Sequence, residues 1–87
     1  MSIKVVSCPA NVPQGLLNSA YNWFMSWCNE YHVDSSYYPY VIISGFDNRR
    51  WEVVFHDQED GNGICVEVGN IYLDDNGKII QATIDLL

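Results

Sequence analysis

The predicted fold depends first on the segment PQGLLNSAYNWFMSWCNEY, residues 13–31. Its apolar side chains recur at intervals of three and four, at Leu17, Ala20, Phe24, Trp27 and Tyr31. This spacing is typical of one face of an α-helix. Pro13 is also a favoured residue in the first turn of a helix. The sequence therefore predicts one long amphipathic helix over residues 13–31.

The other face of this helix is polar but nearly without charge. Only Glu30, close to the end, carries a charge at neutral pH; the remaining polar positions are Asn18, Asn22, Ser26 and Asn29. A helix that lies on a protein surface usually shows charged side chains on its outer face. We therefore expect other elements to enclose this helix on most sides, as an antiparallel sheet that curves around it would do.

The residues after the helix predict four antiparallel strands. Residues 37–46 are rich in aromatic and β-branched side chains, and residues 50–56 alternate between apolar and polar. Residues 64–73 form a third strand, in which one extra residue at Gly69-Asn70 keeps the apolar positions on one face. Asn76-Gly77 predicts a tight turn into a last strand over 78–87. The inward residues of that strand are expected to be Ile80, Ala82, Ile84 and Leu86.

These elements define the expected architecture. The class is α+β, with one long helix packed against a curved four-stranded antiparallel sheet. The β-branched segment at residues 3–8, which stops at Pro9, is a candidate for an extra N-terminal strand. A chain of 87 residues has room for one core, so we expect a single domain over residues 1–87.

The charge balance narrows the class of partner. The chain has eleven Asp and Glu residues and only four Lys and Arg residues, which gives a formal net charge of −7. Binding to nucleic acid or to an anionic membrane requires clustered Lys and Arg, so we expect neither. A basic protein surface would be attracted instead. The negative charge has a plainer alternative explanation, because it also keeps a small protein in solution.

Cysteine and histidine give no pattern that is typical of catalysis or metal binding. Cys8, Cys28 and Cys65 are far apart, so we expect free thiols in a reducing, cytoplasmic compartment, with Cys28 and Cys65 buried. His32 and His56 match no zinc motif, and His56 is expected at the surface. A Cys28–His32 pair at helical spacing would lie on the buried face. We expect no signal peptide and no membrane-spanning stretch, and we expect no catalytic, cofactor-binding or metal-binding residues.

The C-terminal half resembles a known group of folds. The segments that carry the resemblance are Trp51-Glu52-Val53-Val54-Phe55, Val66-Glu67-Val68 and Asp75-Asn76-Gly77-Lys78-Ile79-Ile80. Their order after one helix resembles the cystatin-like and nuclear-transport-factor-2-like α+β rolls. Within these rolls, the order and spacing of the three segments are similar to those of small immunity proteins and of PepSY-type domains. The resemblance implies a sheet whose concave face wraps the helix.

Tyrosines and carboxylates form the candidate binding site. Tyrosine offers a large amphipathic contact area at low entropic cost, and carboxylates attract Lys and Arg of a partner. We expect one partner-binding surface that combines Tyr37, Tyr38, Tyr40, Asp57, Glu59, Asp60, Asp74 and Asp75.

Three functions are compatible with this pattern. The first is a small acidic non-enzymatic inhibitor or immunity-type protein, monomer or homodimer. It would block the basic, nucleic-acid-binding surface of a larger protein, such as a nuclease toxin or a defence effector. The second is a small enzyme or ligand-binding roll with His56, Glu52 or Glu67 in a concave sheet. The third is a structural subunit that self-associates through an apolar strand edge.

Overall fold

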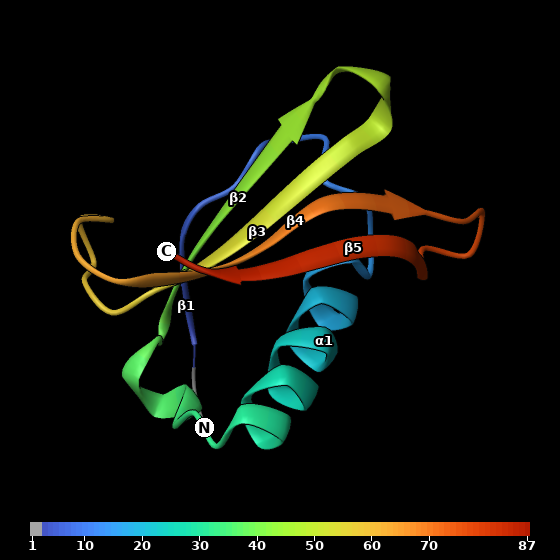
Figure 1. The fold of residues 1–87 in the computed structure, drawn as a ribbon. Coiled ribbons are helices and arrows are strands. Elements are labelled where there is room, and N and C mark those ends of the chain that lie inside the picture. The colour runs from blue at the N-terminus through green and yellow to red at the C-terminus, as the bar shows by residue number, and fades with distance from the viewer. Residues whose placement is uncertain (1–2) are drawn as a thin grey trace.

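One α-helix lies against one face of a five-stranded mixed sheet in the computed structural model, which describes residues 3–87 (Figure 1). The elements are β1 (Lys4–Ser7), α1 (Leu16–Tyr31), β2 (Tyr40–Phe46), β3 (Arg50–His56), β4 (Cys65–Leu73) and β5 (Ile79–Leu86). The strands lie side by side in chain order, from β1 to β5. Short 3₁₀ turns precede β2 at Ser35–Tyr37 and β3 at Asp47–Arg49. The predicted α+β class is confirmed.

The sheet differs from the prediction in its first strand. β1 pairs in parallel with β2, with Lys4 opposite Tyr40 and Val5 opposite Val41, so the sheet is mixed. The other three pairings are antiparallel, as predicted. The parallel pairing arises because the chain passes through α1 between β1 and β2, and such a crossover returns it to the end of the sheet from which it started.

The helix begins at Leu16, three residues later than predicted. Gly15 has a φ of 88°, a left-handed conformation that a helix cannot continue through. Pro13 belongs to the preceding turn, where its carbonyl accepts a hydrogen bond of 3.2 Å from the Leu16 N–H. The fully buried face consists of Leu16, Ala20, Phe24 and Cys28. Trp27 is only half-buried and Tyr31 is exposed. The buried face therefore contains Leu16 where Leu17 was predicted, and Cys28 where Trp27 was predicted.

The prediction that the helix is enclosed on most sides was wrong. Its polar face, with Asn18, Asn22 and Ser26, is exposed, and the side chain of Trp23 is 39% exposed. Among the described elements the sheet is the only layer that covers α1, and the side of the helix that faces away from the sheet stays open (Figure 1). The absence of charge on this face therefore did not indicate burial.

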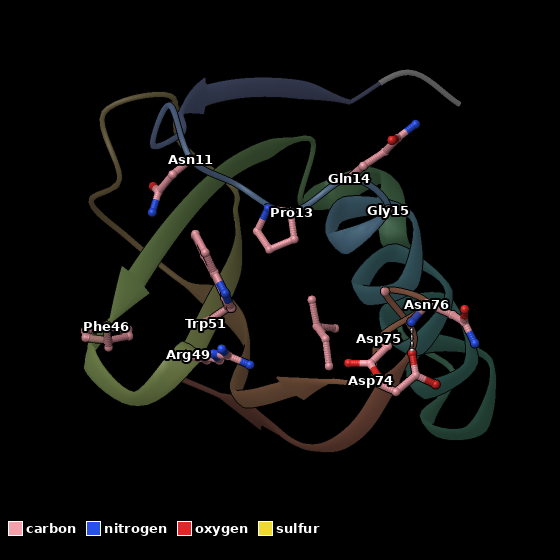
Figure 2. A pocket seen from close by; sticks show the side chains of 12 residues that line it. Asn11, Pro13, Gln14, Gly15, Phe46, Arg49, Trp51, Asp74, Asp75 and Asn76 are labelled. Carbon is pink, nitrogen blue, oxygen red and sulfur yellow. Dashed lines mark hydrogen bonds between the residues drawn. The ribbon is translucent and has the colours of Figure 1, made fainter.

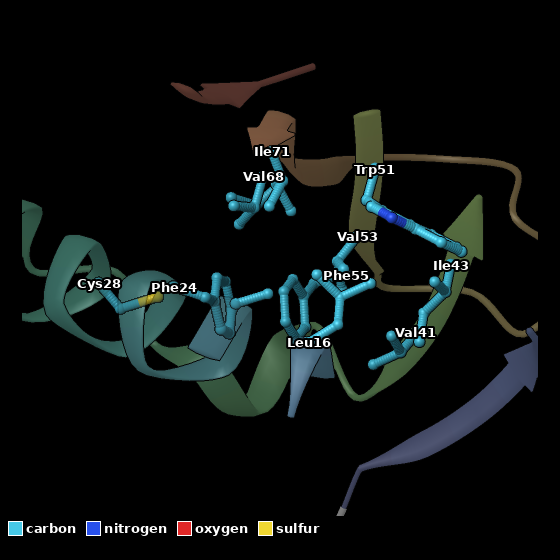
Figure 3. Packing of buried hydrophobic residues seen from close by; sticks show 12 residues of the cluster. Leu16, Phe24, Cys28, Val41, Ile43, Trp51, Val53, Phe55, Val68 and Ile71 are labelled. Carbon is cyan, nitrogen blue, oxygen red and sulfur yellow. The ribbon is translucent and has the colours of Figure 1, made fainter. Parts of the chain in front are cut away.

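Aromatic side chains fill the space between the helix and the sheet (Figure 3). The Phe24 ring stacks on the Phe55 ring with 4.1 Å between centroids and 6° between planes. Trp51 lies against the bare backbone of Gly45, where an added Cβ would come within 2.9 Å of the indole ring. The interior on the helix side is thus occupied by the core. Its other buried members include Leu16, Val41, Ile43, Val53, Val66, Val68 and Ile71.

The predicted bulge in β4 is confirmed. Val53 is opposite Val68 and Trp51 is opposite Ile71, so β4 carries one extra residue, and Asn70 takes a φ of 51°. The expected inward face of β5 was wrong at two positions, because Ile80 is 67% exposed and Leu86 is 56% exposed. A second register shift, between Tyr72 and Leu73, turns Ile79 inward in place of Ile80.

Candidate functional site

The tyrosines and carboxylates of the predicted binding surface lie at two opposite ends of the sheet. Tyr40 pairs with His56, so residues 37–40 and the β3–β4 loop, residues 57–64, share one end, the loop end. β4 then runs the length of the sheet, so the turn at residues 74–77 lies at the other end, the hairpin end (Figure 1). Asp74 and Asp75 therefore share no surface with the other six residues.

The three tyrosines at the loop end have different surroundings. Tyr37 is 69% exposed. The Tyr38 ring packs edge-on against Phe24, with centroids 6.3 Å apart, and burial raises the pKa of its hydroxyl. Tyr40 is half-buried and lies on the face of the sheet that points away from α1, which we call the outer face. Tyr38 thus contributes to the core, while Tyr37 and Tyr40 are accessible to a partner.

The three carboxylates of the loop end differ in their exposure and in their contacts. One oxygen of Asp57 is buried without a hydrogen-bond partner and lies close to Gly63. Glu59 forms an exposed ion pair of 2.7 Å with the Lys4 ammonium, which raises the pKa of that lysine. Asp60 accepts a hydrogen bond of 2.9 Å from the Asn62 N–H. Of these three acids, Glu59 and Asp60 are exposed and Asp57 is half-buried.

The β3–β4 loop also covers part of the outer face. An added Cβ at Gly61 would meet Ile42 at 3.4 Å and the His56 ring at 3.9 Å. His56 is consequently only 8% exposed, and its Nδ1 has no hydrogen-bond partner among the described residues. The expectation that His56 lies at the surface was wrong because the loop folds back over the strand end.

The sequence did not predict a row of carboxylates that crosses the outer face. This acidic row consists of Glu52 on β3, Glu67 on β4 and Asp85 on β5. Glu67 lies directly opposite Asp85 in the β4–β5 pair. Burial raises the pKa of Glu52, and the charge of Glu67 and a hydrogen bond with its carboxylate raise it further. The position of each residue on a polar strand face was visible in the sequence, but the register that aligns them was not.

The outer face offers little positive charge to balance this row. Lys4 is paired with Glu59, and Arg49 and Lys78 lie at the hairpin end. Arg50 is the cation nearest to the row, but its guanidinium stacks over the Phe46 ring at 4.6 Å. The positive charge of Arg50 lowers the pKa of Glu52, but this effect is smaller than the upward effects of burial and of Glu67. The outer face is therefore a negatively charged surface.

A groove of about 830 Å³ opens at the hairpin end (Figure 2). Trp51, Phe46 and Leu73 supply apolar surface to it, and Arg49 and Asp75 supply charge. Asp74 is held in the turn, where its carboxylate accepts hydrogen bonds of 2.9 Å from the N–H groups of Asn76 and Lys78. The other residues that line the groove are Asn11, Pro13, Gln14, Gly15, Asn76 and Gly77.

The position expected for a site in the concave sheet was wrong. The concave face is filled by the core, and the groove contains none of the three residues considered for such a site, His56, Glu52 and Glu67. All three belong to the outer face, because they alternate along their strands with the residues that pack against α1.

The thiols and the candidate metal ligands are dispersed. The three cysteines are free. Cys28 is buried as expected, with 2% exposed, and burial raises the pKa of its thiol, so it is not an accessible nucleophile. Cys65 is only half-buried, on the outer face. Within residues 3–87, no group of three or more His, Cys, Asp or Glu side chains is arranged to hold a metal ion, and no helix has the length and apolarity needed to cross a membrane.

Comparison with known proteins gives no match: no family model, no curated protein and no solved structure is similar to this chain. The resemblance to the cystatin-like and nuclear-transport-factor-2-like rolls stays a prediction.

Neutralising Glu52 should stabilise the protein at neutral pH. A carboxyl whose pKa is raised by folding binds its proton more tightly in the folded state, so stability falls as pH rises above the ordinary value of 4.5 and through the folded pKa. Glu52→Gln removes this loss. We expect a gain of about 0.2–1 kcal/mol at pH 7, typical of a cross-strand pair, and none below pH 4. Urea denaturation at both pH values measures it. A variant that is less stable than the wild type at pH 7 would contradict the unfavourable pairing with Glu67.

Proposed function

We propose that this protein is a small acidic, non-enzymatic inhibitor that acts in the cytoplasm by covering a basic surface of a larger protein. The surface that it uses is the outer face of the sheet, with Tyr40 and the exposed acids of the loop end at its border. The targets that fit are proteins whose activity depends on a cationic, nucleic-acid-binding groove, such as a nuclease toxin or a defence effector.

The acidic row is the observation that carries this proposal. Carboxylates that face each other across two strands destabilise a sheet. In this chain Glu67 faces Asp85, and Glu52 adds a third carboxyl whose pKa is raised by burial and, in addition, by the charge of Glu67. Lys and Arg side chains of a partner would relieve this repulsion, so binding recovers free energy that folding has lost. The row therefore supports a cationic partner.

The mechanism that follows is stoichiometric occlusion. The negative outer face accelerates encounter with a cationic surface, because complementary potentials raise the association rate. Apolar and aromatic groups bordering the row, Tyr40 and Phe46 among them, become buried in the complex and slow its dissociation. No covalent step is involved, and one copy of the inhibitor blocks one basic surface.

A capture experiment with matched baits tests the proposal. The wild type is compared with Glu52→Gln/Glu67→Gln/Asp85→Asn, which neutralises the row, and with Glu30→Gln/Asp47→Asn/Asp75→Asn, which changes the net charge equally away from it. We expect a basic protein from the source cells to be retained by the wild type and the control triple, and lost from the row triple. Equal retention by all three baits, or retention of no basic protein, would contradict the proposal.

A further inference from the structure

The two edges of the sheet are protected to different degrees. β1, at one edge, has four residues, carries Lys4, shifts register between Val5 and Ser7, and is followed closely by Pro9. Short length, lysine, irregularity and proline are the devices that prevent an edge strand from pairing with another chain. β5, at the other edge, has eight residues, contains no proline and carries one charge, that of Asp85. β5 is therefore open to pairing.

The register identifies the backbone groups that β5 leaves free. Cys65 and Leu87 exchange both backbone hydrogen bonds, of 2.8 and 3.3 Å. In an antiparallel pair such hydrogen-bonded positions alternate with positions whose N–H and C=O groups point away from the partner strand. Leu86 is opposite Val66 and Ile84 is opposite Val68, so both direct their backbone groups away from β4. These groups are available to a further strand.

The surroundings of this edge differ on its two faces. On the outer face, Asp85 and the neighbouring Glu67 line the edge with negative charge. On the face of α1, Trp23 is 39% exposed and borders, with Ile79, a shallow hollow of about 300 Å³ next to the start of β5. A strand added to β5 would place alternate side chains on these two faces.

We propose that β5 is the docking edge for an extended segment of the partner, which adds to the sheet as a sixth strand. This inference rests on the proposed function and specifies the partner's contact segment. The segment alternates between basic residues, which face Glu67 and Asp85, and apolar residues, which face Trp23 and Ile79. Main-chain hydrogen bonds to Ile84 and Leu86 hold it, as in other cases of strand addition.

A second copy of this chain fits the edge less well. Two copies that paired through β5 to continue the sheet would bring both acidic rows onto the same outer face, close to the new seam. Each copy carries a net charge of −7, and like charges across an interface oppose association. Charge complementarity therefore favours a cationic segment.

Two peptides of equal composition test the inference. One is an acetylated and amidated octapeptide of alternating Lys and Val, and the other has four Lys followed by four Val. Titrations of ¹⁵N-labelled protein at low salt give both affinities. We expect the alternating peptide to bind about tenfold more tightly, which corresponds to about 1.4 kcal/mol, and to slow amide exchange at Ile84 and Leu86.

Two variants separate the backbone contact from the side-chain contact. Leu86→Pro removes an outward N–H without breaking the ladder to β4, and it should abolish the advantage of the alternating peptide. Leu86→Ala removes the side chain but keeps the N–H, and it should retain the advantage. Circular dichroism verifies that both variants are folded.

The other outcomes distinguish the two proposals. Equal affinity for the peptides, with no protection at Ile84 and Leu86, overturns strand addition but leaves an acidic docking face intact. Failure of both peptides to bind at low salt overturns the acidic face as well. A wild-type dimer in light scattering, with Ile84 and Leu86 protected without peptide, overturns the inference because a second copy then occupies the edge.

Discussion

Replacing Phe24 with alanine should destabilise the protein by about 3–5 kcal/mol, the usual loss when a buried phenylalanine is truncated. Phe24 is fully buried, stacks on Phe55 with centroids 4.1 Å apart, and packs nearly perpendicular to the Tyr38 ring with centroids 6.3 Å apart. Since one helix and one sheet form the whole core, no further layer can collapse into the space. The loss is a large part of the total stability of about 5–15 kcal/mol for a small domain.

Urea denaturation followed by circular dichroism measures this effect. Trp23→Ala is the matched control, because it removes a larger ring from the position directly before Phe24 in the same helix, where the side chain is 39% exposed. We expect this control to lose about 1 kcal/mol or less, apart from the small effect on helix propensity. Similar losses from the two variants would show that the packing of Phe24 between the helix and the sheet is not what holds them together.

Reversing the charge of the acidic row should slow association with the basic partner by about 10- to 100-fold at low salt. Glu67→Lys/Asp85→Lys places positive charge on the outer face, where the partner's cations would approach. The reversed residues stay like-charged across the strands, so the folded state should be about as stable as that of the wild type. Stopped-flow measurement of the association rate with the captured partner gives the result.

Position and salt provide the controls for this second experiment. Asp47→Lys/Asp75→Lys changes the net charge by the same amount at the hairpin end, and it should slow association much less. At 1 M salt, where the screening length is about 3 Å, the difference between the two variants should almost vanish. An equal effect of both reversals would assign the steering to net charge alone. A difference that persists at 1 M salt would contradict electrostatic steering by the row.

The candidate site illustrates which features of a surface a sequence can predict. The composition indicated an acidic protein, and Tyr37, Tyr40, Glu59 and Asp60 are exposed or half-exposed at one end. The sequence could not separate these residues from Asp74 and Asp75, because the acids of the two turns differ only in position along the chain. It also missed the acidic row, whose three members lie 15 and 18 residues apart and meet only through strand register.

Local sequence patterns were enough to predict the elements: a helix from apolar spacing of three and four, strands from alternation, and the β4 bulge from the change of parity at Gly69-Asn70. These are local properties, set by the backbone geometry of neighbouring residues. Four features became visible only in the folded domain: the parallel pairing of β1, the exposed side of α1, the loop over His56 and the alignment of Glu52, Glu67 and Asp85. Each depends on contacts between residues distant in the chain, whose register and layering are set by packing of the whole domain.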